Sequence, residues 1–284
     1  MTIEFPPGSG PYGVTATVDA VWVTLVHAGA VARVPVHPDG RAGRPRVTDL
    51  DDPDCRPSVL CAAPDGAVWF SRTGDDAVGH VDRDGRPTRF PVPAGSAPYG
   101  VAPAADGVWF TATGTDALGL LTPDGAARTW ALPPGSRPAA VTAAPDGTVW
   151  VALNGAGALA RFADGEVDVV ALPTADGGPV GIAAGADGVW VAQILAGSVA
   201  HVAADGAVTE VPLGPGAKPH AVAAVADGCR VTDWGTAHVV DVAGGEVRRR
   251  VDLAPGREPH GLAVGPDGAV WVALESGTLA RVPG

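Results

Sequence analysis

A glutamate, a proline and a histidine follow one another near the C-terminus as Glu258, Pro259 and His260, and a second glutamate, Glu275, comes shortly after. The proline favours an extended backbone at Glu258, and residues two apart on an extended chain share a face, so Glu258 and His260 should point the same way. Carboxylates suit a hard cation such as Mg²⁺, and a neutral imidazole is a natural general base. Together they suit removal of a proton next to a carbonyl group.

Other candidates occupy similar places elsewhere in the chain. His220 follows a proline in "KPHA", and Tyr12 and Tyr99 do so in "GPYG" and "APYG". The tyrosines are candidate substrate contacts, with packing as the alternative. Asp233, in "CRVTDWG", is either a site residue or the partner of Arg230 in a local ion pair. The remaining histidines are expected to be structural or solvated: His27, His37, His80, His201 and His238.

The elements that must position these residues recur along the chain at intervals of 40 to 46 residues, which indicates a repeat architecture. Each copy has a proline that leads into a short apolar run, at Pro11, Pro57, Pro98, Pro138, Pro179, Pro219 and Pro259. About ten residues later comes a strand led by tryptophan, at Trp22, Trp69, Trp109, Trp150, Trp190 and Trp271. The sixth copy has Arg230 where tryptophan is expected.

Asp-Gly turns between the two markers, and a further pair of alternating segments after them, predict four short antiparallel strands per copy. Seven such units of about 40 residues are typical of a seven-bladed β-propeller, and we expect residues 1–284 to form it as a single domain. "TIEF" at residues 2–5 resembles the fourth strands of other copies, whereas the last copy stops after its third. The N-terminal strand should therefore complete the last blade and close the ring.

In such a ring the innermost strands line a central channel, and loops leading into them from one face form the usual ligand pocket. The proline elements should supply these loops. Copies two, four and five carry little chemistry beside the proline, so the titratable groups concentrate in the last two copies.

Composition excludes some partners. The 19 Lys and Arg against 31 Asp and Glu give a net charge of −12 without a basic stretch, so nucleic acid and anionic membranes should be repelled. No apolar stretch approaches the roughly 20 residues that cross a bilayer, and the N-terminus has no secretory pattern. We expect a cytoplasmic monomer. The three cysteines lack metal-ligand spacing and should be buried thiols: Cys55, Cys61 and Cys229.

The "PxG…DGxVWFT" pattern covers the whole chain, and "KPHA" is followed forty residues later by "EPHG" and then by a glutamate four past the tryptophan. This combination resembles the virginiamycin B lyase family. The resemblance implies a seven-bladed propeller that confers antibiotic resistance by opening a cyclic depsipeptide of the streptogramin B type. The implied reaction is a Mg²⁺-dependent β-elimination at the ester-linked threonine. It also implies that Glu258 and Glu275 hold Mg²⁺, that His260 is the base and that His220 completes the active centre.

The chain departs from the family pattern at the third residue after the tryptophan, which is often glutamate in the family. Here these positions, which we place on the inner strands, are Leu25, Arg72, Ala112, Leu153 and Gln193. "RPSV" and "RPAA" in the second and fourth copies also alter the predicted pocket wall. Another cyclic ester or peptide therefore stays open as the substrate.

Two alternatives compete with a lyase. A metal-dependent lactonase-type hydrolase would need carboxylate and Asn ligands from several blades around the axis, and Asn154 is the only asparagine. A non-catalytic binding platform is common among propellers, because fold does not settle function. It predicts that replacing His260 or Glu258 leaves function intact.

Overall fold

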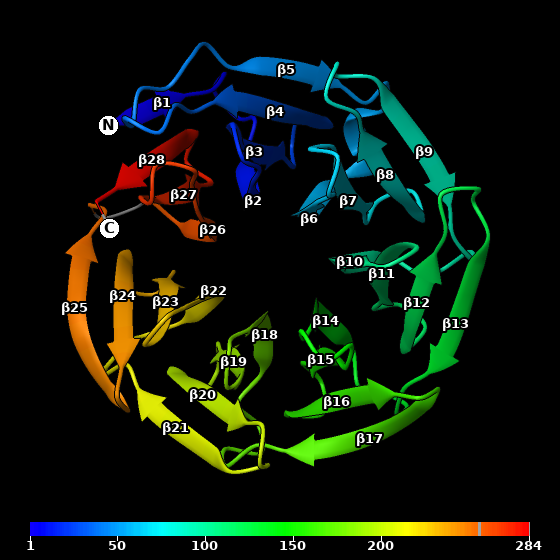
Figure 1. Cartoon of the computed structure of the whole chain (residues 1–284), viewed down its shortest axis with the longest axis vertical. Helices are drawn as coiled ribbons and strands as arrows, with labels where there is room; N and C mark the ends of the chain where they lie inside the picture. Colours follow the sequence, from blue (N-terminus) through cyan, green and yellow to red (C-terminus); the bar gives the residue numbers. More distant parts are fainter. Residues whose placement is uncertain (255–256, 284) are drawn as a thin grey trace.

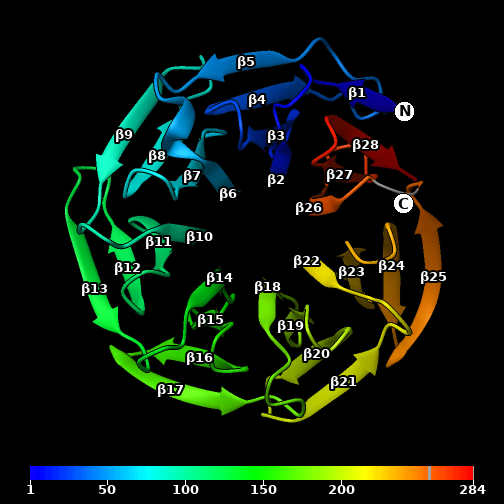
Figure 2. The same cartoon turned by 180° about the vertical axis from the view of Figure 1, so that it is seen from behind.

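The chain forms a ring of seven four-stranded sheets around a central axis (Figure 1), and the view from behind shows the same closed ring (Figure 2). The computed structural model describes residues 1–254 and 257–283. Every paired strand within these ranges is antiparallel to its neighbour, from β1 with β28 to β8 with β9. The predicted seven-bladed propeller is confirmed.

Four concentric rings of strands make up the blades. The innermost strands are β2 (Pro11–Ala16), β6 (Pro57–Ala62), β10 (Pro98–Ala104), β14 (Pro138–Ala143), β18 (Pro179–Ala184), β22 (Pro219–Val225) and β26 (Pro259–Val264). The second strands are β3 (Ala20–Leu25), β7 (Val68–Arg72), β11 (Gly107–Ala112), β15 (Val149–Leu153), β19 (Gly188–Gln193), β23 (Gly228–Asp233) and β27 (Val270–Leu274). The third strands are β4 (Ala30–Pro35), β8 (Ala77–Val81), β12 (Ala117–Leu121), β16 (Ala158–Ala163), β20 (Ser198–Ala203), β24 (His238–Ala243) and β28 (Thr278–Val282). The outer strands are β5 (Arg46–Asp49), β9 (Pro87–Pro91), β13 (Ala127–Ala131), β17 (Glu166–Ala171), β21 (Val208–Pro212), β25 (Glu246–Asp252) and β1 (Thr2–Glu4).

Each innermost strand begins at the proline that marks its copy, as the repeat predicts. Proline lacks an N–H, so it is tolerated at the first residue of a strand, where one ladder bond fewer is needed. In blade 7 the chain uses both of its ends: β26, β27 and β28 come from the C-terminal region and β1 from the N-terminal region. Ile3 pairs with Leu279, and this confirms the predicted closure.

The core lies between blades rather than within one. Seven clusters of buried side chains occupy the interfaces of neighbouring blades; the one that joins blades 7 and 1 contains Phe5, Val23 and Trp271. All six residues of β3 are buried, whereas those of the outer strand β17 are exposed or half-buried. Burial of an aliphatic or aromatic side chain contributes about 1.5–3 kcal/mol, so each blade depends on both neighbours for stability.

At one facing position of the second and third strands, six blades pair a large residue with a small one, and the remaining blade pairs Val231 with Val240. Where the second strand carries phenylalanine, the third carries glycine: Phe70 faces Gly79 and Phe110 faces Gly119. A Cβ on Gly119 would lie 2.1 Å from Cζ of Phe110. Four blades pair valine with alanine instead, as at Val151 and Ala160.

The longer first interval accommodates extra chain at the rim. It includes a 3₁₀ turn, η1 (Pro53–Cys55), whose preceding Asp52 accepts a hydrogen bond from the Asp54 amide. The three cysteines are buried free thiols, as expected. In the part of the chain that the structure describes, no helix is long and apolar enough to cross a membrane.

Candidate active site

The turn before each innermost strand sets the geometry of the site. Glu258 has a φ of 48°, in the left-handed region, so the expectation of an extended backbone there is wrong. Arg56 and Arg137, before the prolines of blades 2 and 4, have the same conformation. It turns the carbonyl toward the end of the second strand of the same blade: Glu258 accepts a hydrogen bond from the amide of Glu275 at 3.1 Å. This hydrogen bond stabilises the left-handed conformation of Glu258, although a residue before proline usually prefers an extended backbone.

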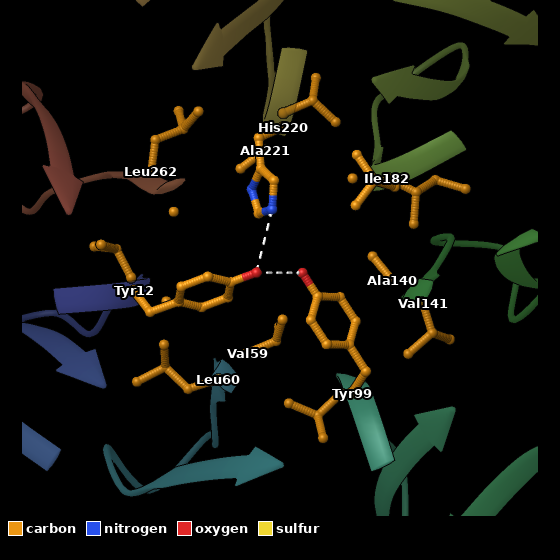
Figure 3. A pocket seen from close by; sticks show the side chains of 17 residues that line it. Tyr12, Val59, Leu60, Tyr99, Ala140, Val141, Ile182, His220, Ala221 and Leu262 are labelled. Carbon is orange, nitrogen blue, oxygen red and sulfur yellow. Dashed lines mark hydrogen bonds between the residues drawn. The ribbon is translucent and has the colours of Figure 1, made fainter. Parts of the chain in front are cut away.

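The channel contains a cavity of about 180 Å³, and Figure 3 shows three polar side chains pointing into it. The hydroxyls of Tyr12 and Tyr99 are hydrogen-bonded at 2.8 Å. The Tyr12 hydroxyl also lies 3.2 Å from Nε2 of His220. The rest of the wall is mostly aliphatic, with Val59, Ala140, Val141, Ile182 and Leu262 among its side chains. The structure therefore places Tyr12, Tyr99 and His220 together, from blades 1, 3 and 6.

His260 lies beside this group on β26. Its ring stacks on that of Tyr12, with centroids 4.5 Å apart, and meets the ring of His220 edge-on at 4.7 Å. The residue is 9% exposed. Burial lowers the pKa of His260 below its ordinary value, while the nearby carboxylates of Glu275 and Glu258 act in the opposite direction. At neutral pH the ring is therefore largely unprotonated and able to accept a proton.

Glu275 connects two histidines. Its Oε2 lies 2.5 Å from Nε2 of His260, and its Oε1 lies 2.9 Å from Nε2 of His27. His27 follows β3 in blade 1, so this carboxylate joins blades 7 and 1. Sequence reasoning assigned His27 to the structural or solvated histidines and so missed its place beside the site. Its only sequence signal is its position five residues after Trp22, close to the position of Glu275 relative to Trp271.

His220 differs from His260 in its electrostatic surroundings. Burial, together with the neighbouring His260, lowers the pKa of His220 to about 3, so this ring is neutral at physiological pH. Burial also raises the pKa of Tyr12 and of Tyr99, so both phenols keep their protons. The centre of the channel therefore holds uncharged hydrogen-bonding groups, and the negative charge lies to one side at Glu275.

Asp233 has a different environment from the other candidates. Its side chain is fully buried and accepts hydrogen bonds from the amides of Lys218 and Gly235 and from the hydroxyl of Thr236. These contacts hold the loop after β23, and we assign Asp233 a structural role. Arg230 pairs with Asp241, at 3.5 Å, and not with Asp233.

The five positions where the chain departs from the family pattern lie on second strands, not on inner ones. All are buried, and each faces the marker proline of its blade, as Leu25 faces Pro11 and Gln193 faces Pro179. They are Leu25, Arg72, Ala112, Leu153 and Gln193. None of these five residues lines the channel cavity.

Glu258 and Glu275 are the candidate carboxylates of a magnesium site. Among residues 1–254 and 257–283, no group of three or more His, Cys, Asp or Glu side chains is arranged to hold a metal. Mg²⁺, however, commonly binds through one or two carboxylates and retains several waters. Glu275 is half-buried, Glu258 is exposed, and both lie close enough to His260 to act on its pKa. The carboxylate oxygens of this pair are the donor type that a hydrated Mg²⁺ takes.

Comparison with known proteins gives a consistent result. The model of the virginiamycin B lyase family matches residues 3–282. A virginiamycin B lyase of Nocardia farcinica (strain IFM 10152) is 43% identical over 88 residues, which are 31% of this chain and 29% of that protein. A streptogramin B lyase structure is 30% identical with a TM-score of 0.89, covering 99% of this chain and 97% of the other.

A further structure is a catalytically inactive virginiamycin B lyase from Staphylococcus aureus with quinupristin, which is 27% identical. Its TM-score is 0.88, and the match covers 99% of this chain and 97% of that chain. The family model spans nearly the whole of the present sequence. The chain therefore belongs to the virginiamycin B lyase family.

Proposed function

We propose that this protein is a Mg²⁺-dependent carbon–oxygen lyase that linearises a cyclic depsipeptide of the streptogramin B type. Family membership and the likeness to a streptogramin B lyase support the reaction class. The observation that carries the proposal is the buried His260, whose Nε2 lies 2.5 Å from a Glu275 oxygen at the edge of the channel. A neutral imidazole beside a carboxylate is suited to abstract a proton and to be stabilised once it is charged.

The reaction is a β-elimination. His260 takes the proton from Cα of the ester-linked threonine, and the electron pair of that bond forms a double bond between Cα and Cβ. The bond between Cβ and the ester oxygen breaks, and the carboxylate leaves with its electrons. The product is a linear peptide with a dehydro residue, and no water is consumed.

Glu258 and Glu275 would hold the Mg²⁺, which when bound supplies a Lewis acid for the carbonyl that shares the developing charge. Glu275 also stabilises the protonated form of His260. His220 and Tyr12 present neutral hydrogen-bonding groups to the reacting part of the substrate. Preorganised polar groups of this kind act on the charge that develops in the transition state.

The cavity limits how the substrate binds. Its volume of about 180 Å³ is below the range of roughly 300–1,000 Å³ that is usual for small-molecule pockets. The channel can therefore take the reacting ester and a neighbouring side chain, while most of the ring rests on the face outside. The aliphatic wall suits an apolar substituent.

The test is mass spectrometry of quinupristin incubated with the purified protein, with Mg²⁺ and again with EDTA. Elimination leaves the mass unchanged while shifting retention, whereas hydrolysis adds one water. We expect linear product of unchanged mass only when Mg²⁺ is present.

His260→Ala is the matched variant. It should reduce kcat by about 10²–10⁴-fold, the usual contribution of a general base, without loss of the folded state in circular dichroism. Product heavier by one water would favour the lactonase-type hydrolase. Full turnover by His260→Ala would refute the assigned base, and a lack of turnover by the wild type would favour a binding platform or another substrate.

A further inference from the structure

His27 lies at the seam between the first and last blades and contacts a carboxylate of the site. Its Nε2 is 2.9 Å from Oε1 of Glu275, while the other oxygen of Glu275 faces His260. Each oxygen of this carboxylate thus faces a different ring. The two residues are 248 positions apart in the sequence, so only ring closure brings them together.

The backbone around His27 is built to hold the ring in this place. The amide of His27 donates to the carbonyl of Ser9 at 3.1 Å, and the amide of Val26 donates to that of Gly10 at 2.9 Å. Gly10 has a φ of 61°, and a Cβ there would lie 2.4 Å from Cδ2 of His27. The imidazole therefore occupies space that only a glycine leaves open.

Blade 5 provides a natural comparison. Gly178 has the same position and the same left-handed conformation as Gly10, and a Cβ on it would lie 2.8 Å from Cγ of Leu195. Leu195 follows Trp190 at the same distance as His27 follows Trp22. The loop thus accepts either side chain, and what distinguishes blade 1 is the polar group aimed at Glu275.

We infer that His27 is a positioning residue: by donating a hydrogen bond from Nε2 to Glu275 it fixes the carboxylate, so that the second oxygen faces the active centre. The contact between His27 and Glu275 is seen in the geometry of the structure, whereas its effect on catalysis rests on the function proposed above. Partners that orient a ligand carboxylate typically contribute 10- to 100-fold to metal affinity or activity. His27 is 49% exposed, so the pair should add little to stability.

Three variants test this role. His27→Leu removes the donor but keeps a side chain that blade 5 accommodates over its glycine. His27→Gln retains a donor nitrogen at a similar reach. Leu195→Ala alters the same loop position of blade 5, which contacts no carboxylate of the site, and serves as the control.

The readouts separate positioning from folding. The first is the dissociation constant of Mn²⁺, measured by electron paramagnetic resonance, and the second is kcat and KM with quinupristin. The third is the ¹⁵N chemical shifts of the histidine rings in the metal-free protein. His27→Leu should weaken Mn²⁺ binding or lower kcat by about 10- to 100-fold with an unchanged melting temperature. His27→Gln should recover most of this loss, and Leu195→Ala should behave as wild type.

The outcomes distinguish this inference from the proposed function. Wild-type Mn²⁺ affinity, kcat and His260 ring shifts in His27→Leu would overturn the positioning role. If the wild type neither binds Mn²⁺ nor converts quinupristin, the proposed function fails. The ring shifts of the metal-free protein then decide this inference: a His27 ring protonated at Nε2, and a His260 signal that moves in His27→Leu, support it, and their absence overturns it.

Discussion

The two channel histidines have different neighbours and therefore different chemistry. His260 contacts the Glu275 carboxylate, so a proton gained by its ring is stabilised. His220 faces a tyrosine hydroxyl and another imidazole, and its pKa falls to about 3. This difference supports His260 as the proposed base, with His220 as a neutral partner.

The neutrality of His220 should be visible in the dependence of stability on pH. An unfolded histidine titrates near 6.5 and the folded His220 near 3, so between these values the unfolded state binds more protons. This residue therefore makes the free energy of unfolding rise with pH from about 3 to about 6.5 and level off above that range. Urea unfolding of His220→Gln across the same range should give a shallower rise than the wild type. Equal slopes would mean that His220 is not buried as a neutral ring.

Among the repeated elements, six of the seven blades pair a large residue with a small one at one facing position of the second and third strands, and blade 6 pairs Val231 with Val240 instead. Phenylalanine requires a facing glycine, as Phe110 requires Gly119, and valine is paired with alanine in four blades. The phenylalanine pairing rule follows from close packing, because the ring fills the space that a side chain on the facing residue would need.

This rule predicts that a second substitution at Phe110 offsets part of the destabilisation caused by a substitution at Gly119. Gly119→Ala should destabilise the protein by about 1–3 kcal/mol through overpacking, and Phe110→Val should also destabilise it by leaving a cavity. The double variant recreates the pair of blade 4, so its loss should be smaller than the sum, with a coupling of about 0.5–3 kcal/mol. Denaturant unfolding measures all three variants.

The matched control combines Gly119→Ala with Phe70→Val. Phe70 faces Gly79 in blade 2 and belongs to a different core cluster, so these two effects should simply add. Coupling as strong as in the first pair would refute a local packing rule.

The repeated elements also show which features of the fold and the site could be predicted from the sequence. The number of blades follows from the proline and tryptophan spacing, the strand count from the Asp-Gly turns and alternating segments, and ring closure from the likeness of residues 2–5 to the fourth strands of other copies. The backbone of Glu258 could not be inferred from its proline, since a hydrogen bond to the amide of Glu275 decides it. His27 was missed because its partner lies in the last blade and no repeat-level pattern joins them. The convergence of Tyr12, Tyr99 and His220 on the channel was expected, but the hydrogen bonds between them depend on the diameter of the channel, which the sequence does not report.

At the scale of the whole molecule, the ring closes at blade 7, where β1 is placed beside β28 (Figure 1). Phe5 follows β1 and is 8% exposed in the cluster between blades 7 and 1. Phe5→Ala should therefore lower the free energy of unfolding by about 3–5 kcal/mol. Val47→Ala, on the outer strand β5 and 53% exposed, should change it by less than about 0.5 kcal/mol. Equal effects in thermal or denaturant unfolding would show that the closure contributes no special stability.

The position of the seam also has a consequence for biosynthesis. The groups around His260 come from blades 1, 6 and 7, and the Tyr12–His220 and His27–Glu275 contacts span 208 and 248 residues. The chain makes β1 and blade 1 first and the other three strands of blade 7 last, so a growing chain can stack its early blades while it still lacks the site residues of blades 6 and 7. We therefore expect catalytic competence only when the last blade docks against the first, and a prematurely terminated polypeptide should be inert however well its other blades have folded.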